Sequence, residues 1–280
     1  MFGFKLSKQL LDLGDLVTLD DTNVDLQLSF IQAINKHDVT VQRLDGIYFN
    51  SAQDWNILNR PIKSTYDSAK SVIFQSIFNQ KLSEKYFGKH RSSHVIHNGT
   101  DIETISRIDP ITHPVTDEFE NVWCCASSWR PHKRLKENVM YFLEHASERD
   151  CLVIAGSNPD FEISHPRIFY VGNLDWTVLI SLYKRSKYFV HLALMDHCPN
   201  VVVDARASGC HIICSDSGGT KEIAGKKATI IKDMEWDFSP FKLYEPPKLD
   251  FNLKSTNVFD NDIDIKTVAK KYKNVFTELV

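Results

Sequence analysis

The sequence predicts an α/β fold of two units, each with a parallel sheet flanked by helices. Short apolar runs, several ending in glycine, alternate with helical stretches along most of the chain. Residues 109–120, with prolines and no periodicity, are the best candidate for a linker between the units. The 280 residues are enough for two modest domains with cores of their own.

The first unit is predicted to span residues 1–113. It begins with a helical stripe of phenylalanine and leucine before Gly14 and not with a strand, so we expect a shortened domain that lacks the first strand of a complete α/β unit. Strands are expected at 25–31, 39–43, 71–76 and near 94–97. Pro61 is expected to open a helix to Ala69, and a second helix is expected at 78–87, ended by Gly88.

The second unit is predicted to span residues 114–262. Strands are expected at 121–126, 151–156, 167–172, 188–194 and 228–231, and helices from Leu135 and after the predicted cap Asp175. Residues 233–260 are aromatic, acidic and interrupted by prolines, which predicts an irregular crossing segment. A terminal helix within 263–280 carries apolar residues on one face, and we expect it to pack back on the first unit.

One stretch, residues 191–222, organises the chemistry. It contains a strand end, a polar loop with Asp196, a helix opened by Pro199, and a second strand that ends in Gly218 and Gly219. In parallel sheets, ligands bind at the loops that follow the carboxyl ends of strands. The first amides of the helix, near Asn200 and Val201, are a ready site for a phosphate. Carboxylates beside them, Asp196 and Asp204, suit the hydroxyl groups of a nucleotide sugar.

Composition narrows the class of partner. The chain has a formal net charge of -3, a sequence pI of about 6.4 and 42% hydrophobic residues, so neither a nucleic acid nor an anionic membrane is expected as the main partner. No apolar run approaches the roughly 20 residues of a membrane span, which leaves at most peripheral membrane contact. The six cysteines lie mostly in apolar runs without a Cys-x-x-Cys pair, which indicates reduced core residues and a cytoplasmic protein.

The stretch resembles the signature of the retaining glycosyltransferases of family 4, within the glycosyl transferases group 1, which have the GT-B fold. That signature is two glutamates separated by seven residues, a Gly, an apolar strand and a Gly-Gly-x-x-Glu turn. This chain has Asp196 and Asp204 at that separation, then Gly209, and then Gly218-Gly219-Thr220-Lys221-Glu222. Both acids are aspartate, about one methylene shorter than glutamate. The resemblance implies two Rossmann-like domains that face a cleft.

The resemblance also implies a donor site. A cationic loop follows the strand at 121–126, and cations there can neutralise a diphosphate leaving group. Lys133 matches the family's lysine, while Arg130 lies closer to it than the family's arginine does. Asp204 would accept from the ribose, Asp196 would orient the sugar together with Gly218, Gly219 and Thr220, and the loop at Gly172 would contact the nucleobase.

Candidate residues of the first unit lie just past predicted strand ends. Arg43 and Asp45 stand beside Gly46, in a run similar to one found in a subgroup of these enzymes, and Asp45 or His97 could position the acceptor. A helix cap with its ion pair explains Arg43 and Asp45 equally well. His90, His94 and His97 lack a suitably spaced carboxylate or cysteine, so no metal site is predicted. Asp262-Ile-Asp264 has the Asp-x-Asp pattern of metal-dependent transferases, but capping of the last helix explains it better.

The predicted function is therefore transfer of a sugar from a nucleotide-diphosphate donor to an acceptor hydroxyl, with retention and without a metal or other cofactor, in glycan or polysaccharide synthesis. Two alternatives remain open at this point. One is a non-catalytic GT-B accessory subunit, for which a protein partner would complete the first domain. The other is a nucleotide-sugar 2-epimerase, which shares the fold but lacks the paired-acid loop.

Overall fold

In the computed structural model, which describes residues 2–20, 23–35 and 37–280, the chain forms two compact units. Unit 1 comprises Met1–Asp101, Trp236–Lys242 and Asp262–Val280, and unit 2 comprises Ile102–Glu235 and Leu243–Asn261. Residues 102–113, expected in the first unit, are therefore part of unit 2. The short segment 236–242, expected in the second, is part of unit 1.

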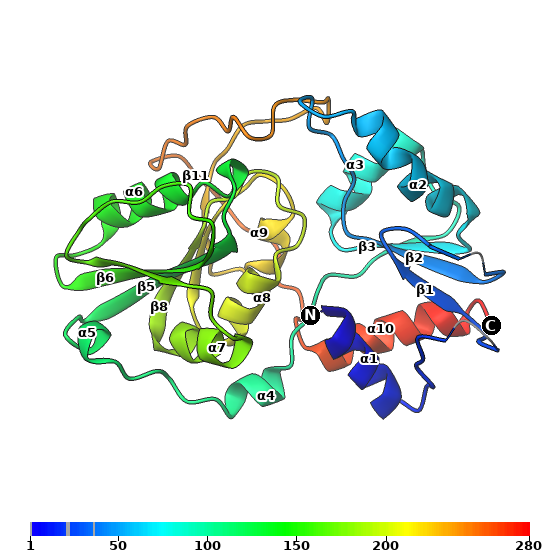
Figure 1. The fold of residues 1–280 in the computed structure, drawn as a ribbon, viewed down its shortest axis with the longest axis horizontal. Coiled ribbons are helices and arrows are strands. Elements are labelled where there is room, and N and C mark those ends of the chain that lie inside the picture. The colour runs from blue at the N-terminus through cyan, green and yellow to red at the C-terminus, as the bar shows by residue number, and fades with distance from the viewer. Residues whose placement is uncertain (1, 21–22, 36) are drawn as a thin grey trace. The chain divides into compact units, whose positions relative to one another are not determined.

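Unit 1 is built on a parallel sheet with strand order β1-β2-β3-β4 (Figure 1). The strands are β1 (Gln27–Phe30), β2 (Thr40–Leu44), β3 (Ser71–Phe74) and β4 (Ser93–Val95). The helices are α1 (Phe2–Asp12), α2 (Trp55–Ser68), α3 (Ile77–Phe87) and α10 (Ile265–Thr277). In Figure 1, α2 and α3 cover one face of the sheet and α1 and α10 cover the other.

The core of unit 1 explains why these segments pair. Phe2, Leu6 and Leu10, on one stripe of α1, pack with Tyr272 of α10 and with alternate residues of the strands, such as Val41. The expected return of the terminal helix to the first unit is thus seen in this packing. Asp264 caps α10 by accepting from the Lys266 amide at 2.9 Å, so capping does account for this aspartate.

One helix begins earlier than expected. Pro61 lies inside α2 instead of opening it, because the helix starts at Trp55 after the cap residue Asp54. The Asp54 carboxylate accepts from the Ile57 amide at 3.1 Å, which fixes the first turn upstream of the proline. The local cap therefore decides where the helix begins, and the proline is accommodated within it.

Unit 2 is built on a seven-stranded sheet with order β11-β10-β9-β8-β5-β6-β7, parallel except for β10 with β11. The strands are β5 (Asn121–Ser128), β6 (Asp150–Ser157), β7 (Ile168–Gly172), β8 (Ser186–His191), β9 (His211–Ser215), β10 (Thr229–Ile231) and β11 (Lys254–Ser255). The helices are α4 (Ile102–Ser106), α5 (Pro114–Asp117), α6 (Leu135–His145), α7 (Trp176–Arg185), α8 (Asn200–Ala207) and α9 (Thr220–Ile223). Pro131–Lys133 form one turn of 3₁₀ helix.

The face of this sheet covered by α6 carries a large apolar core that includes Trp123, Phe142 and Ile154, while α7 and α8 lie against the other face (Figure 1). The sheet order places β5, β8 and β9 side by side at its centre. The loops after these three strands therefore meet at one edge of the sheet. Those loops contain Lys133, Asp196 and the Gly218-Gly219 turn.

Among the described residues, no helix is long and apolar enough to cross a membrane.

Candidate active site at the edge of the unit 2 sheet

Lys133 and Asp196 form an ion pair at this edge. The Lys133 Nζ lies 2.5 Å from Asp196 Oδ2, and their side chains are 18% and 14% exposed. Burial alone would raise the pKa of Asp196. The nearby Lys133 ammonium and the hydrogen bond from His191 outweigh burial and hold that pKa well below its usual value. Asp196 is therefore a carboxylate at neutral pH.

Histidines surround this pair. His191, at the end of β8, is almost fully buried, and its Nε2 lies 2.9 Å from Asp196 Oδ2. Burial lowers the pKa of His191, and it lowers those of His132 and His197 to about 4. All three imidazoles are thus neutral at pH 7, and Lys133 is the charged donor of the group.

The main chain of the Asp196 loop is fixed by its neighbours. Met195 adopts a left-handed conformation with φ of 55°, and its amide donates to the Ser217 hydroxyl at 3.3 Å. The Gly219 amide donates to the Asp196 carbonyl at 2.7 Å. A Cβ on Gly218 would lie 2.4 Å from that carbonyl oxygen, so only glycine allows the two loops to approach this closely.

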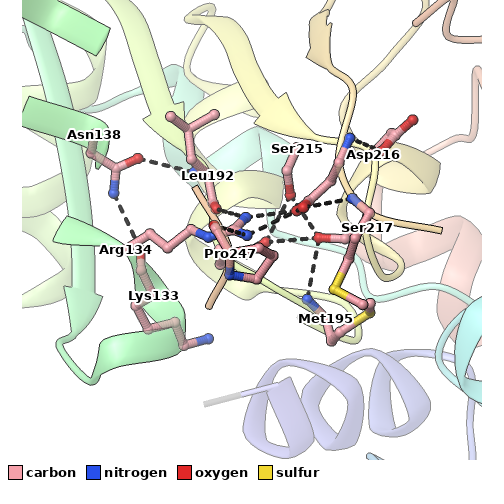
Figure 2. A network of polar contacts seen from close by, with 12 residues as sticks. Lys133, Arg134, Asn138, Leu192, Met195, Ser215, Asp216, Ser217 and Pro247 are labelled. Carbon is pink, nitrogen blue, oxygen red and sulfur yellow. Dashed lines mark hydrogen bonds and ion pairs between the residues drawn. The ribbon is translucent and has the colours of Figure 1, made fainter. Parts of the chain in front are cut away.

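A buried arginine braces the loop after β5. Arg134, whose backbone also has a left-handed conformation, forms a bidentate ion pair with Asp233 at 2.6 and 3.2 Å. Both side chains are 0% exposed. Arg134 also donates to the carbonyls of Leu192 and Pro247. The Asn138 side chain accepts from the Leu192 amide and donates to the Lys133 carbonyl. Figure 2 shows the contacts of Lys133, Arg134 and Asn138 with Leu192 and Pro247, together with Ser215 at the end of β9 and Ser217 after it.

Asp204 lies on the second turn of α8 and is 3% exposed. The indole Nε1 of Trp176, the first residue of α7, donates to Asp204 Oδ2 at 2.9 Å. Three residues separate Trp176 from Gly172 at the end of β7, an exposed glycine with φ of 66°. The indole thus connects the Gly172 loop to Asp204, two positions that the sequence assigned to one ligand.

The remaining donor-site candidates lie nearby along the chain. Asn200 and Val201 form the first turn of α8, where the cap residue Pro199 supplies no side-chain bond. Gly218, Gly219 and Thr220 are buried, and the Thr220 hydroxyl has no hydrogen-bond partner among the described residues. Arg130 is exposed before the 3₁₀ turn, and its carbonyl accepts from the Lys133 amide. Asp175 precedes α7 as predicted, but its side chain does not cap the helix.

In unit 1, Arg43 is almost fully buried and pairs with Asp45, so the ion pair that the sequence offered as an alternative is present. The guanidinium also donates to Asn98 at 2.5 Å and to the Tyr272 hydroxyl at 3.0 Å, and it lies 4.3 Å from the ring centroid of Phe2. These contacts join β2 to the segment after β4 and to α10. The Asp45 side chain is 33% exposed, and His97 is half-buried two residues beyond β4.

Four residues of this site were not singled out from the sequence, namely Arg134, Asn138, Trp176 and His191. Arg134 belongs to a loop rich in cations, and its partner Asp233 lies 99 residues away, so no local pattern joins the two. No group of three or more His, Cys, Asp or Glu side chains that could hold a metal ion occurs in the described part of the chain.

Comparison with known proteins identifies the fold. Residues 152–237 match the family model of Glycosyl transferases group 1. No curated protein sequence matches the chain. The solved structure of Anabaena Alr3699/HepE in complex with UDP is similar, with a TM-score of 0.62 and 16% identity over 86% of this chain and 72% of that one.

Two further structures are similar over 86% of this chain and 67% of theirs. Sucrose-phosphate synthase from Thermosynechococcus elongatus has a TM-score of 0.60 and 13% identity, and the trehalose-6-phosphate synthase OtsA has 0.58 and 11%. The predicted GT-B fold is therefore confirmed, as is the resemblance to the glycosyl transferases group 1.

Proposed function

We propose that this GT-B chain, which carries a Glycosyl transferases group 1 segment, transfers a sugar from a nucleotide-diphosphate donor to an acceptor hydroxyl. The observation that carries the proposal is the ammonium of Lys133, fixed at the sheet edge where β5, β8 and β9 end. The matched segment includes Asp196, Asp204 and the Gly218-Gly219 turn beside it. The similar structure of Alr3699/HepE has also been determined with UDP-glucose, which supports a nucleotide sugar as the ligand class.

The proposed chemistry follows from charge. A departing nucleoside diphosphate carries developing negative charge, which Lys133, Arg130 and the amides of the first turn of α8 would stabilise. Asp204, oriented by Trp176, would accept from the ribose hydroxyls, and the Gly172 loop would adjoin the base. Retention of the anomeric configuration and independence from metal belong to this proposal, as does a role in glycan synthesis.

Unit 1 would supply the acceptor side. Asp45 and His97 follow β2 and β4 and keep part of their surface exposed, whereas the buried guanidinium of Arg43 would hold Asp45 in place. The acceptor would be a glycan or another hydroxyl compound.

We also propose a cytoplasmic location. The six free, buried cysteines support it, because cysteines of secreted proteins commonly form disulfides.

The direct test is a thermal-shift screen against UDP, GDP, ADP and dTDP and their common sugars, with magnesium or with EDTA. A ligand at 100 times its dissociation constant adds about 2.7 kcal/mol, which raises the melting temperature by a few degrees. We expect one nucleotide series to shift the protein equally in both buffers. If no nucleotide shifts a folded sample, the proposed donor site is wrong and an accessory role is favoured.

Turnover tests the role of Lys133. With the donor found in the screen, Lys133→Ala should lower kcat more than it weakens donor binding, because the charge on the leaving group is greatest in the transition state. Equal turnover by Lys133→Ala and the wild type would contradict the role. Interconversion of the free donor sugar without any acceptor would instead indicate an epimerase.

A further inference from the structure

The carboxylate of Asp196 is engaged on both of its oxygens. Oδ2 receives Lys133 Nζ at 2.5 Å and His191 Nε2 at 2.9 Å, and Oδ1 accepts from the His197 amide at 3.1 Å. The side chain is 14% exposed, and the three donors already on it limit what else this carboxylate can bind. Three donors thus occupy most of the acceptor positions of this carboxylate, and a sugar hydroxyl could bind only at the position that remains on Oδ1.

Those donors come from elements that are themselves fixed. His191 belongs to β8, and the backbone of Lys133 is tied through its carbonyl to Asn138 of α6. The Asp196 carbonyl is held by Gly219, and Gly218 packs against the same peptide. Neither the carboxylate nor its main chain can therefore turn toward a new partner without breaking several contacts.

Lys133 is about as buried as Asp196, but it keeps unused hydrogen-bonding capacity. An ammonium has three N–H donors, and its bond to Asp196 leaves two for other acceptors. Its side chain is 18% exposed and follows a surface turn whose other cation, Arg130, is exposed. The ion pair thus removes most of the rotational freedom of a long side chain while leaving donors for an anion.

We infer that Asp196 is a positioning residue that holds the Lys133 ammonium in place for the donor diphosphate, and that it does not bind the transferred sugar. The shorter aspartate, in place of the glutamate of the resembling family, keeps the carboxylate withdrawn between Lys133 and His191. This inference rests on the proposed function and assigns Asp196 a different place in it from the one that the sequence suggested.

The two roles predict different binding patterns. A residue that acts through Lys133 affects every ligand with a diphosphate, whether or not a sugar is attached. A sugar ligand affects only the sugar-bearing form. The test therefore compares the affinities of Asp196→Asn and wild-type protein, by calorimetry, for UDP, GDP, ADP or dTDP, whichever binds, and for the matching UDP-glucose, GDP-mannose, ADP-glucose or dTDP-glucose.

We expect Asp196→Asn to weaken both ligands by the same factor, about two- to tenfold, because the freed lysine must be ordered on binding. Loss confined to the sugar-bearing ligand would overturn the inference and leave the proposed function standing. Failure of every nucleotide to bind the wild type would overturn the proposed function itself, and the inference with it.

Two further variants keep the test decisive. In a Lys133→Ala background, any effect of Asp196→Asn should be the same for both ligands, because Asp196 does not contact the sugar; a loss for the sugar-bearing ligand alone would overturn the inference. If Asp196→Asn does not fold, Asp196→Glu replaces it. The longer side chain should displace Lys133 and weaken both ligands equally, whereas tighter binding of the sugar-bearing ligand alone would contradict positioning.

Discussion

At the scale of single residues, the buried pair of Arg134 and Asp233 should be a large contributor to stability. Arg134→Met leaves Asp233 as an uncompensated buried charge, which typically costs about 3–5 kcal/mol. The control is Arg149→Met, which breaks an ion pair to Glu120 whose side chains are 79% and 52% exposed. That change should cost at most about 1 kcal/mol. Urea unfolding of both variants measures the difference, and similar losses would contradict the role assigned to burial.

Trp176 offers a second test at this scale. Trp176→Phe keeps an aromatic ring but removes the N–H that donates to Asp204. The loss of one hydrogen bond of about 1 kcal/mol should weaken nucleotide binding about fivefold. Trp55→Phe, a change to a partly buried tryptophan of unit 1, should leave binding unchanged and serves as the control. Equal affinity of Trp176→Phe and wild type would show that the indole does not orient Asp204 for the ribose.

Some residues of the candidate site could be predicted from the sequence, and others could not. Lys133, Asp196 and Asp204 could be named because strand, loop and helix lie within short stretches whose spacing carries a signature. Arg134 with Asp233, and Trp176 with Asp204, are partners only because the sheet order brings distant loops together. A buried arginine and an indole donor have no local pattern that distinguishes them from a surface cation and a core aromatic.

At the scale of elements, the turn between β9 and α9 should be sensitive to the smallest change. Gly218→Ala places a Cβ 2.4 Å from the Asp196 carbonyl oxygen, at a φ of 73°. Gly209→Ala has a similar backbone, with φ of 97°, but its Cβ would meet nothing within 4 Å. The second variant therefore measures the conformational cost alone, roughly 1 kcal/mol.

Gly218→Ala should lose more stability than Gly209→Ala, and it should also weaken nucleotide binding, because the Asp196 loop must move. Thermal unfolding and calorimetry of both variants check this pair of expectations. Unchanged binding by Gly218→Ala would mean that the close approach of the two loops does not set the site.

Element boundaries were predictable where local chemistry marks them. Gly88 ends α3 and Asp264 caps α10, both as the sequence indicated. The start of α2 was not predicted, because Asp54 and Pro61 are both plausible start signals and only the cap bond to the Ile57 amide decides between them. The two-residue strand β11, which lies in the segment expected to be irregular and pairs with β10, likewise has no periodicity to reveal it.

At the scale of the whole molecule, the neutral buried histidines predict a dependence of stability on pH. In the folded state, burial lowers the pKa values of His132 and His197 to about 4, while both take their ordinary value of 6.5 when unfolded. Between these values the unfolded chain binds more protons, so the stability is fully present above pH 6.5 and is lost as the pH falls toward 4. The slope is at most about 1.4 kcal/mol per pH unit for each histidine.

Denaturant unfolding at pH 7, 6 and 5 measures this slope. His132→Gln and His197→Gln should each flatten it over that window, whatever their own effect on stability at pH 7. Asp196 contributes in a separate pH range. The lowered pKa of its carboxylate stabilises the folded state, and this stability is lost only as the pH falls below the ordinary value of 3.8. A wild type whose stability is constant from pH 7 to 5 would contradict the buried, neutral state of these imidazoles.

The interleaving of the two units along the chain has a consequence for biosynthesis. Every residue of unit 2 precedes Asp262, whereas unit 1 still requires α10. Until α10 leaves the ribosome, the apolar stripe of α1 at Phe2, Leu6 and Leu10 lacks the part of its core that Tyr272 and its neighbours supply. Because most of unit 2 lies between α1 and α10 along the chain, unit 2 can fold before the core of unit 1 is complete.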